Sequence, residues 1–571
     1  MSVRIVDSVA ARFLSTLASL KIEAVFANAG TDFAPLIEAS VALRAEARDC
    51  PDFVVVPHEN VAVAMAIGHY RAKATLAVVM VHTTVGTANA LCGIMNAFRD
   101  HIPLLLIAGR TPHTESGSAA SRRAMIHWGQ DTFDQGGLVR EYTKWDYELR
   151  SGQDVAVLLQ RAVDIALTAP YGPAYLTLPR EVLAETAVSL ALNLDRPYGA
   201  IGRDVDPGIV RDIAESIRLA ECPMLLTSFL GRDPECFELL SVLAEEFSIG
   251  VVQPFARDLN LSAVHPMNLG IQPQLVLHSA DLVLVVDCEV PWVPDRCTPN
   301  PDAMLIHCSD DPFFQHYPLR GFSADIAVAA PSGRFLAALL QQLRVDQSPQ
   351  SKLLQQRTLR IQQLRQVVEN DLAVTRQSIE ASNRTHPLEL AECLNQHIDE
   401  NTIVVNELAV TLDSLILTAA GSYVAGSHAG GLGFGLGAAL GIKRAFPEKT
   451  LIALIGNGSY LFGNPVCAHF VAQAERLPTL TIVANNERWH SVHSATKGMY
   501  PDGYSVNADS MPLVDLAPSP EFHNIIEACG GQGKLVESVD QLPQALAWAL
   551  DMVAAGHSVL LNVLTDPWDR V

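Results

Sequence analysis

Short apolar runs alternate with segments of helical periodicity along the whole chain, and no other feature limits the possible folds as strongly. In the first block, EAVFANAG, DFVVVP, ATLAVVMVH, IPLLLIAG and GPAYLTLPREV are typical of strands, and NVAVAMAIGHYRAKA and GTANALCGIMNAFRD are typical of helices. Strands joined through helices pair in parallel, because a parallel connection needs a long crossover. The pattern therefore predicts an α/β fold built on parallel sheets.

The same alternation recurs in two further blocks. The expected strands are PMLLTSF, IGVVQ, ADLVLVVD and AMLIHCSD in the second block, and NTIVVNE, TLIALIGNG, LPTLTIVANN and HSVLLNVL in the third. Because 571 residues exceed what one hydrophobic core holds, we predict three doubly wound parallel-sheet domains, at residues 1–185, 200–342 and 386–571. Residues 343–385 are polar and Gln-rich with helical spacing of Leu, Ile and Val, so we expect a helical linker there.

Charge and cysteine usage limit the partners and the compartment. The net charge of −22 makes nucleic acid or an anionic membrane an unfavourable partner. The ten cysteines form no CxxC pair, which is typical of reduced core residues in a cytoplasmic protein. The segment MSVRIVDSVAARFLSTLASL has the pattern of an amphipathic helix, without the apolar region of a signal peptide. We expect a cytoplasmic location.

Two of the expected strands end in polar residues that could bind a ligand. The run LIGNGSYLF ends a strand in Gly456-Asn457-Gly458, and NNERW follows another strand after 26 intervening residues, 459–484. Ligands gather beyond the carboxyl ends of parallel strands, and the two glycines allow a bulky anion to approach the backbone. Ser459 opens a segment leading into a helix, whose N-terminal amides can face a phosphate group.

The same strand ends offer oxygen ligands for a metal ion. Asn457 and Asn486 present side-chain carbonyl oxygens, and a backbone carbonyl shortly afterwards, at Arg488, can complete the set. Hard oxygen ligands beside a phosphate are typical of Mg²⁺. Two ordinary turns would explain either element alone, since Gly and Asn are common turn residues.

The pair of elements resembles the thiamine diphosphate motif of the decarboxylase superfamily, Gly-Asp-Gly followed at a similar spacing by Asn-Asn. Further segments match that superfamily in order along the chain: PHENVAVAMAIGHYRA, GTANALCGIMNAF, PLLLIAGRTP, GPAYLTLP, VVNE and GGLGFGLGAALG. The resemblance implies thiamine diphosphate and Mg²⁺ as cofactors, a pyrimidine-binding first domain and a diphosphate-binding third domain.

The resemblance also implies roles for single residues. Glu59 would be the glutamate that activates the cofactor by exchanging a proton with its aminopyrimidine ring. Its apolar surroundings predict burial, which favours the protonated form of a carboxyl group. A partly exposed glutamate that begins a helix is the simpler alternative. Leu432 would bend the cofactor into a V shape, and Glu407 would belong to the cofactor-binding domain. Because the glutamate and the diphosphate-binding domain meet across a subunit interface in this superfamily, we expect a homodimer at least and a homotetramer as the assembly.

Asn457 departs from the superfamily pattern, which has an aspartate at this position. The site loses one negative charge and keeps an oxygen ligand, so the affinity for Mg²⁺ should fall. Two interpretations compete: a working site that binds Mg²⁺ more weakly, and a chain that has drifted away from catalysis. The retention of Glu59, Leu432 and Asn486 favours the working site.

The substrate class must come from other residues. NAGTDFAPLI and VHTTVGTANA resemble benzoylformate decarboxylase, which places Thr31 at the substrate carboxylate and His82 at a catalytic histidine. A histidine bonded to backbone at a strand end is the simpler view of His82. The second histidine of that enzyme is absent from the corresponding segment, VDCEVPWVPDR, where Trp292 could form a substrate wall or a packed interface. His490 and His493 could replace it.

We therefore predict a 2-oxo acid decarboxylase or carboligase of the benzoylformate-decarboxylase type, acting on a small 2-oxo acid. Three alternatives remain open: an acetolactate synthase-like transferase, a 2-hydroxyacyl-CoA lyase, and a catalytically weakened cofactor-binding paralogue. The middle block has no clear version of the flavin-binding segments of acetolactate synthases, and it is mostly acidic, which disfavours a CoA nucleotide.

Overall fold

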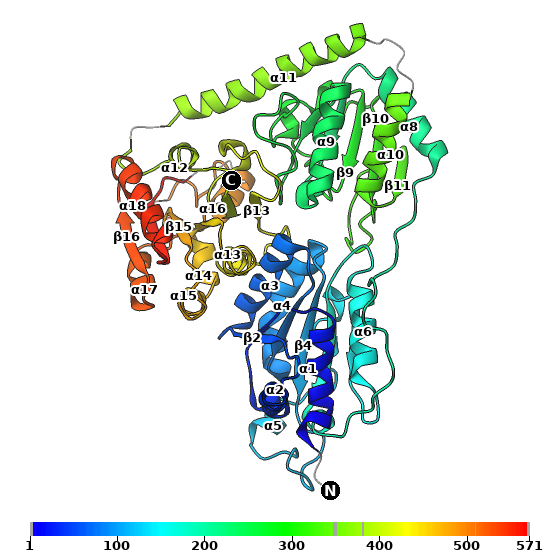
Figure 1. Ribbon diagram of the computed structural model, residues 1–571. Helices are drawn as coiled ribbons and strands as arrows, with labels where there is room; N and C mark the ends of the chain where they lie inside the picture. Colours follow the sequence, from blue (N-terminus) through cyan, green and yellow to red (C-terminus); the bar gives the residue numbers. More distant parts are fainter. Residues whose placement is uncertain (1–3, 346–350, 380–381, 509, 568–571) are drawn as a thin grey trace.

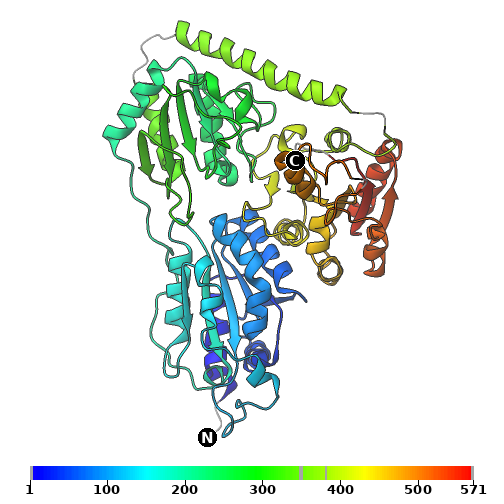
Figure 2. The same cartoon turned by 180° about the vertical axis from the view of Figure 1, so that it is seen from behind.

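The computed structural model describes residues 4–345, 351–379, 382–508 and 510–567, and it contains three parallel β-sheets flanked by helices (Figures 1 and 2). The predicted α/β class with three parallel-sheet domains is confirmed. Residues 346–350 and 380–381 of the predicted linker lie outside the described residues. The three sheets lie within the three predicted domain ranges, whose exact limits stay a prediction.

The first sheet has the strand order β2-β1-β3-β4-β6-β5. Its strands are β1 (Ala24–Ala27), β2 (Asp52–Val55), β3 (Ala77–Val81), β4 (Leu104–Arg110), β5 (Trp145–Glu148) and β6 (Ala174–Pro179). The helices around it are α1 (Val9–Ser19), α2 (Ala34–Ala45), α3 (Glu59–Lys73), α4 (Thr83–Arg99), α5 (Ile126–Gly129), α6 (Val155–Ala166) and α7 (Arg180–Leu183). Strand β3 is buried along its whole length, as expected for a strand covered on both faces.

The middle sheet has the order β11-β10-β9-β7-β8. It consists of β7 (Pro223–Leu226), β8 (Gly250–Val252), β9 (Leu282–Val286), β10 (Met304–Ser309) and β11 (Ile326–Ala329), with α8 (Pro207–Leu219), α9 (Pro234–Phe247) and α10 (Ser332–Val345). The linker contains the long helix α11 (Ser351–Gln377), which crosses from the middle domain to the third domain in Figures 1 and 2. Trp292 is buried in the middle-domain core, edge-on to Phe322, which favours the packing interpretation of this residue.

The third sheet has the order β13-β12-β14-β15-β17-β16. Its strands are β12 (Thr402–Glu407), β13 (Tyr423–Ala425), β14 (Thr450–Gly456), β15 (Leu480–Asn485), β16 (Gln532–Val536) and β17 (Val559–Leu564). The helices are α12 (Pro387–Asn395), α13 (Phe434–Ala445), α14 (Asn457–Phe462), α15 (Pro465–Ala474), α16 (His490–Met499), α17 (Phe522–Ala528) and α18 (Leu542–Ala554).

The first and third domains share one apolar cluster, and helices α3 and α13 cross at its centre. Glycines allow this close approach. A Cβ atom on Gly68 would lie 2.2 Å from the carbonyl oxygen of Ala438, and one on Gly441 would lie 2.0 Å from that of Met65. Because these neighbours are backbone atoms that cannot move aside, larger residues would force the helices apart.

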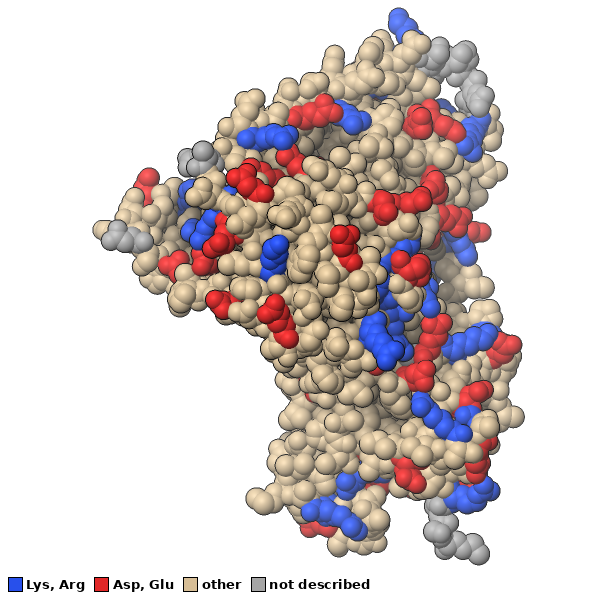
Figure 3. All heavy atoms as spheres, turned by 60° about the vertical axis from the view of Figure 1, so that its left-hand side comes forward, with Lys and Arg blue, Asp and Glu red and all other residues tan. Residues whose placement is uncertain are grey.

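The surface charge and the length of the helices concern the expectation that neither nucleic acid nor a membrane is a partner. The face seen in Figure 3 carries acidic and basic side chains in small mixed groups, with broad uncharged stretches between them. In the part of the chain that the structure describes, no helix combines the length and the apolar character needed to cross a bilayer.

Candidate active site

The two strand ends singled out from the sequence are neighbours in the third sheet. Strands β14 and β15 pair in parallel, with Gly456 opposite Ala484, so Asn457 and Asn486 follow adjacent strands at the same edge. The segment that Ser459 was expected to open is itself helical, since helix α14 begins at Asn457. The amide of Asn457 is 3% exposed, and its nitrogen has no hydrogen-bond partner among the described residues. A buried amide without partners is rare in a folded protein unless a ligand completes it.

Asn486 and Arg488 follow β15, the strand adjacent to β14, which Asn457 follows. The side-chain oxygen of Asn486 accepts a hydrogen bond from the backbone N–H of Arg488 at 3.1 Å. Arg488 pairs with Asp515 in an isolated antiparallel bridge, and its carbonyl accepts no hydrogen bond from the described residues. Two amide oxygens and one free carbonyl suit a hard cation such as Mg²⁺. Within the described residues, no group of three His, Cys, Asp or Glu side chains could hold a metal ion.

Gly458 is required by packing as well as by the motif. A Cβ atom there would lie 2.1 Å from the ring of Trp489, which lies shortly after the Asn-Asn element. Trp489 thereby fixes the second strand end against the first. His490 and His493 lie on the adjoining helix α16 with their rings stacked, 6.0 Å apart between centroids. Their proposed catalytic role stays a prediction.

Glu407 holds the loop that precedes α13. It ends β12, is 4% exposed, and accepts hydrogen bonds from the backbone N–H groups of Gly433 at 2.8 Å and Gly435 at 2.7 Å. Burial raises the pKa of the Glu407 carboxyl, and these bonds, with one from the Ser459 hydroxyl, lower it. The carboxylate thus completes the N-terminus of the helix, as a capping residue does. Leu432, which is half-buried, lies in the loop that Glu407 fixes.

Glu59 is buried, so the alternative of a partly exposed helix-starting glutamate is wrong. The residue is 5% exposed at the first position of α3. Asn28 donates to one carboxylate oxygen at 3.0 Å, and Asn89 donates to the other at 3.1 Å. Both partners are neutral amides, so they orient the carboxylate without adding a charge. Gly86 makes room for it, since a Cβ atom there would lie 3.1 Å from Glu59 Oε1.

His82 is held by side chains rather than by backbone, which contradicts the simpler view of this residue. Its Nδ1 contacts Asp32 Oδ1 in a short hydrogen bond, and its Nε2 lies 3.2 Å from Gln130 Oε1. The hydrogen bond to Asp32 raises the pKa of His82, and Glu59 is close enough to add to that shift. Thr83, which follows, has φ of 38°, a strained value for a β-branched residue.

Thr31 lies beside a histidine that the sequence did not single out for this place. Its hydroxyl is 3.2 Å from Nε2 of His127. The Nδ1 atom of His127 accepts a hydrogen bond from the backbone N–H of Arg123 at 3.1 Å, so Nε2 carries the proton and donates to Thr31. Burial and the nearby Arg180 lower the pKa of His127, which keeps the ring neutral.

Sequence reasoning missed Asp32, Gln130 and His127. Asp32 directly follows Thr31, and a carboxylate next to a site threonine was a signal within reach. Its Oδ2 atom is buried without a hydrogen bond to any described residue. Gln130 and His127 lie far along the chain from Thr31 and His82, in a segment without regular periodicity, and nothing in the local pattern links them.

The structure brings the predicted residues together in two groups. Glu59, His82 and Thr31 gather at the carboxyl edge of the first sheet, and Asn457, Asn486 and Leu432 lie in the third domain. Among the described residues, no hydrogen bond or ion pair joins one group to the other. Residues beside the two groups do contact each other, since the amide of Asn464, at the start of α15, lies 3.3 Å from His58 beside Glu59.

Comparison with known proteins agrees with this division. Residues 7–138 match the profile described as "Thiamine pyrophosphate enzyme, N-terminal TPP binding domain". Residues 410–563 match "Thiamine pyrophosphate enzyme, C-terminal TPP binding domain". The two matches cover the two groups of site residues, with the exception of Glu407, which precedes the second match.

Curated relatives and solved structures span nearly the whole chain. Benzoylformate decarboxylase from Pseudomonas aeruginosa is 26% identical over 95% of this chain and 96% of its own length. The acetolactate synthase isozyme 3 large subunit of Escherichia coli is 24% identical over 91% of this chain and 89% of its own. The 4-hydroxybenzoylformate decarboxylase of Rhodococcus jostii has the same fold, with a TM-score of 0.79 at 24% identity over 98% of this chain and 99% of that chain. The chain belongs to the thiamine pyrophosphate enzyme family.

Proposed function

We propose that the protein is a thiamine diphosphate- and Mg²⁺-dependent 2-oxo acid decarboxylase or carboligase of the benzoylformate-decarboxylase type. The observation that carries the proposal is the position of His82, held by Asp32 and Gln130 within electrostatic reach of Glu59. The nearly full-length similarity to a benzoylformate decarboxylase supports the substrate class.

The side chains of the first domain divide the work. Thiamine diphosphate, when bound, supplies the carbon nucleophile and the electron sink. Glu59 exchanges a proton with the cofactor ring, while Asn28 and Asn89 fix the direction of its carboxylate. Asp32 favours the protonated form of His82, so the imidazole can give a proton to the reacting carbon or oxygen.

Thr31 is proposed to bind the substrate carboxylate. Because His127 donates to the Thr31 oxygen, the threonine O–H stays available to donate to an anionic substrate. His127 and Thr31 thus form a chain of donors that ends at the carboxylate. The neutral imidazole of His127 adds no charge, so the negative carboxylate still leaves easily as carbon dioxide.

The third domain would hold the metal and the diphosphate. The oxygens of Asn457, Asn486 and the Arg488 carbonyl would bind Mg²⁺, and the N-terminal amides of α14, with Ser459, would face the diphosphate. The buried amide nitrogen of Asn457, which has no partner among the described residues, could donate to a diphosphate oxygen while the amide oxygen faces the cation. The working but weaker Mg²⁺ site is therefore the proposal that we retain over a catalytically weakened paralogue.

We propose a second copy of this chain as the partner that completes the site. Among the described residues, no hydrogen bond or ion pair links the two groups of site residues directly, and α14 and α15 expose apolar side chains next to the diphosphate motif. These are Leu461, Phe462, Val466 and Phe470, exposed by 39%, 53%, 60% and 47%. Such a cluster is typical of a subunit interface. Sedimentation of Val466→Glu against wild type tests this, and an unchanged oligomeric state contradicts it.

The middle domain bears on the flavin and CoA alternatives. A cavity of about 850 Å³ lies where α3, α9, α10 and the carboxyl edge of the middle sheet meet. Asp233, Asp287 and Asp310 line it, and none forms an ion pair with another described residue. Burial raises the pKa of Asp287 to about 7. Arg71, Lys73, Arg232 and Lys449 line the same cavity, so its charge does not distinguish a decarboxylase from a flavin- or CoA-dependent relative.

A panel of aryl and short alkyl 2-oxo acids tests the proposed function. The purified chain, loaded with thiamine diphosphate and Mg²⁺, should release carbon dioxide fastest from aryl substrates. Parallel assays with pyruvate alone for acetolactate, and with a 2-hydroxyacyl-CoA for cleavage, address the two enzymatic alternatives. Activity in either of these assays without decarboxylation of any panel member would overturn the proposal. Cofactor binding without any turnover would favour the weakened paralogue.

A further inference from the structure

The loop between β13 and α13 needs support from outside itself. Residues 426–433, GSHAGGLG, contain glycine at four of eight positions and carry Leu432. Gly430 and Gly433 have φ values of 70° and 88°, which other residues adopt at a cost. A segment this rich in glycine loses much conformational entropy when it is ordered, so contacts to other elements must fix it.

The C-terminal end of α4 supplies the first set of contacts. The side chain of Asn96 accepts a hydrogen bond from the N–H of Gly431 at 3.1 Å and donates to the carbonyl of Gly431 at 2.8 Å. The hydroxyl of Ser427 donates to Asp100 at 2.8 Å. Asn89, which orients Glu59, lies seven residues before Asn96 and therefore on the same face of α4. One helix thus contacts both Glu59 and the loop.

The middle domain supplies the second set of contacts. The N–H of Ala425 donates to the carbonyl of Arg257 at 2.8 Å, and Asp258 forms an antiparallel bridge with Val424. His428 reaches back from the loop, with Nε2 3.2 Å from the Phe255 carbonyl and Nδ1 3.3 Å from Nη1 of Arg257. Burial and Arg257 lower the pKa of His428 to about 4, so its Nδ1 accepts from the guanidinium at neutral pH.

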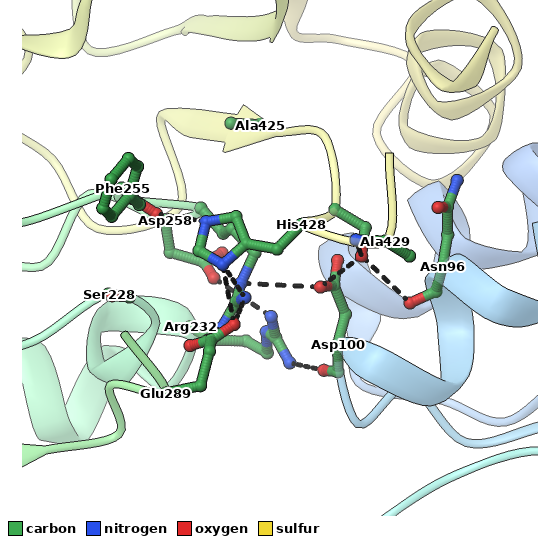
Figure 4. A network of polar contacts seen from close by, with 12 residues as sticks. Asn96, Asp100, Ser228, Arg232, Phe255, Asp258, Glu289, Ala425, His428 and Ala429 are labelled. Carbon is green, nitrogen blue, oxygen red and sulfur yellow. Dashed lines mark hydrogen bonds and ion pairs between the residues drawn. The ribbon is translucent and has the colours of Figure 1, made fainter. Parts of the chain in front are cut away.

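Arg257 connects the two sets, and Figure 4 shows its partners Asp100, Glu289 and His428 close together. Its side chain is 1% exposed and forms a two-point contact with Glu289, including a 2.8 Å bond from Nη2 to Oε2. Its Nε lies 3.5 Å from Asp100, the residue that holds Ser427. Desolvation cancels much of the energy of such a buried pair. What the pair supplies is geometry, because the planar guanidinium fixes the relative positions of Glu289, Asp100 and His428.

We infer that Arg257 is a positioning residue for the cofactor, through the loop that carries Leu432. This inference rests on the proposed place of Leu432 beside the cofactor. The middle domain, which contributes none of the predicted site residues, then acts on the reaction by holding the loop in its binding shape. The competing view is that Arg257 only joins three domains, so that its loss lowers stability without a specific effect on the cofactor.

A matched pair of variants separates these views. Arg357 is also a buried arginine against the middle domain, 2% exposed, and it donates to the carbonyls of Ala220 and Ile217, away from the loop. Arg257→Met and Arg357→Met each remove one buried guanidinium from the full-length chain. For Arg257→Met we expect the dissociation constant of thiamine diphosphate, at fixed Mg²⁺, to rise about tenfold above that of Arg357→Met. Hydrogen exchange of amides 427–433 should accelerate only in Arg257→Met.

Equal cofactor affinities of the two variants, within about twofold, would overturn the inference, as would unchanged exchange in the loop. A second pair of variants, with smaller changes, covers the case in which Arg257→Met does not fold. Ser427→Ala removes the bond to Asp100, whereas Ser422→Ala removes a bond to the nearby Ala419 carbonyl. Faster loop exchange in Ser427→Ala than in Ser422→Ala supports the inference, and equal exchange contradicts it.

Leu432→Ala tests the proposed place of Leu432 beside the cofactor separately from the positioning role of Arg257. If Leu432→Ala leaves cofactor affinity unchanged, the placement of Leu432 in the site is wrong and the proposed site fails. If Leu432→Ala weakens the cofactor and Arg257→Met does not, the site stands and only the positioning role fails.

Discussion

Two buried polar regions of this molecule differ in how their charges are satisfied. At the junction of the three domains, four ion pairs within 4.0 Å join described residues; they are Arg71–Asp258, Arg232–Asp258, Arg257–Glu289 and Arg257–Asp100. At the candidate active site, the amide nitrogen of Asn457 and the Oδ2 atom of Asp32 are buried without a hydrogen bond to any described residue.

The difference separates structural polar groups from functional ones. A buried polar group without a partner costs free energy, and folded proteins keep few of them. At the junction, opposite charges offset part of this cost, although atoms such as Nη2 of Arg232 and Oδ2 of Asp258 also lack a hydrogen bond to any described residue. The paired charges let the junction serve as a rigid joint. The active site leaves groups unpaired, which is the pattern expected where a cofactor, metal or substrate supplies the missing partner.

The largest expected effect tests the active-site side of this comparison. Glu59→Gln should lower turnover by several orders of magnitude, because an amide cannot relay a proton, while Asn28 and Asn89 still hold a side chain of the same shape. Turnover at saturating thiamine diphosphate measures this, with the exposed Glu38→Gln as control. Activity within a factor of about three of wild type would mean that Glu59 does not exchange the proton.

His82→Ala comes next. Loss of a general acid or base typically lowers the chemical rate by about 10²–10⁴, and His82 is held by side chains in the manner of a reactive group. Single-turnover decarboxylation together with a melting curve checks it. A lower melting temperature with an unchanged chemical step would instead make His82 structural.

A substitution at the junction of the three domains should lower the free energy of unfolding much more than one at the active site. Glu289→Gln leaves Arg257 with only the more distant Asp100, and breaking a buried pair costs about 3–5 kcal/mol. Asn457→Ala removes an amide whose nitrogen has no hydrogen-bond partner among the described residues, so we expect a change below about 1 kcal/mol in the cofactor-free chain. Chemical unfolding of both variants measures the contrast, and similar losses in the two would remove the distinction between the regions.

Asn457→Asp tests whether this residue binds Mg²⁺. Restoring a charged oxygen at the end of β14 should tighten Mg²⁺ about tenfold, because the cation gains a carboxylate ligand. Titration of activity with Mg²⁺ after dialysis against chelator gives the value. If Asn457→Asp needs the same or a higher Mg²⁺ concentration for half of its full activity, Asn457 is not a ligand.

The smallest effect concerns pH. Asp32 raises the pKa of His82 above its ordinary value of 6.5, so the protonated pair stabilises the folded chain below pH 6.5, and this stability is lost as pH rises through the folded pKa. The excess stability of wild type over Asp32→Asn should therefore be larger at pH 5.5 than at pH 8. A difference that does not change with pH would show that the two side chains are not coupled.

How much of the fold could be predicted depended on where each strand lies in its sheet. The eleven central strands of the three sheets were predicted, together with the edge strands β2 and β8, from continuous apolar runs. The four strands that were missed, β5, β11, β13 and β16, are all edge strands. The side chains of β5, for example, are all half-buried. An edge strand is covered less completely, so its sequence need not carry the apolar run that predicts a strand.

The residues of the candidate site were also predicted only in part. Glu59, Thr31, His82 and the Gly-Asn-Gly element were found because their local sequences resemble those of a known family. Asp32, Gln130 and His127, which hold His82 and Thr31, were not. Their roles depend on distances across the fold, such as the 96 positions between Thr31 and His127, and no local pattern records such a contact.

The sequence by itself determined the α/β class, the parallel sheets and the family, because periodicity and short motifs are local properties of the chain. Only the tertiary structure decided which polar groups are paired. It shows Arg257 between Glu289 and Asp100, and it shows the buried amide of Asn457 without a partner. The physical reason is that burial and pairing depend on which distant segments the fold brings together, and the cost of a buried charge or amide exists only after they have met.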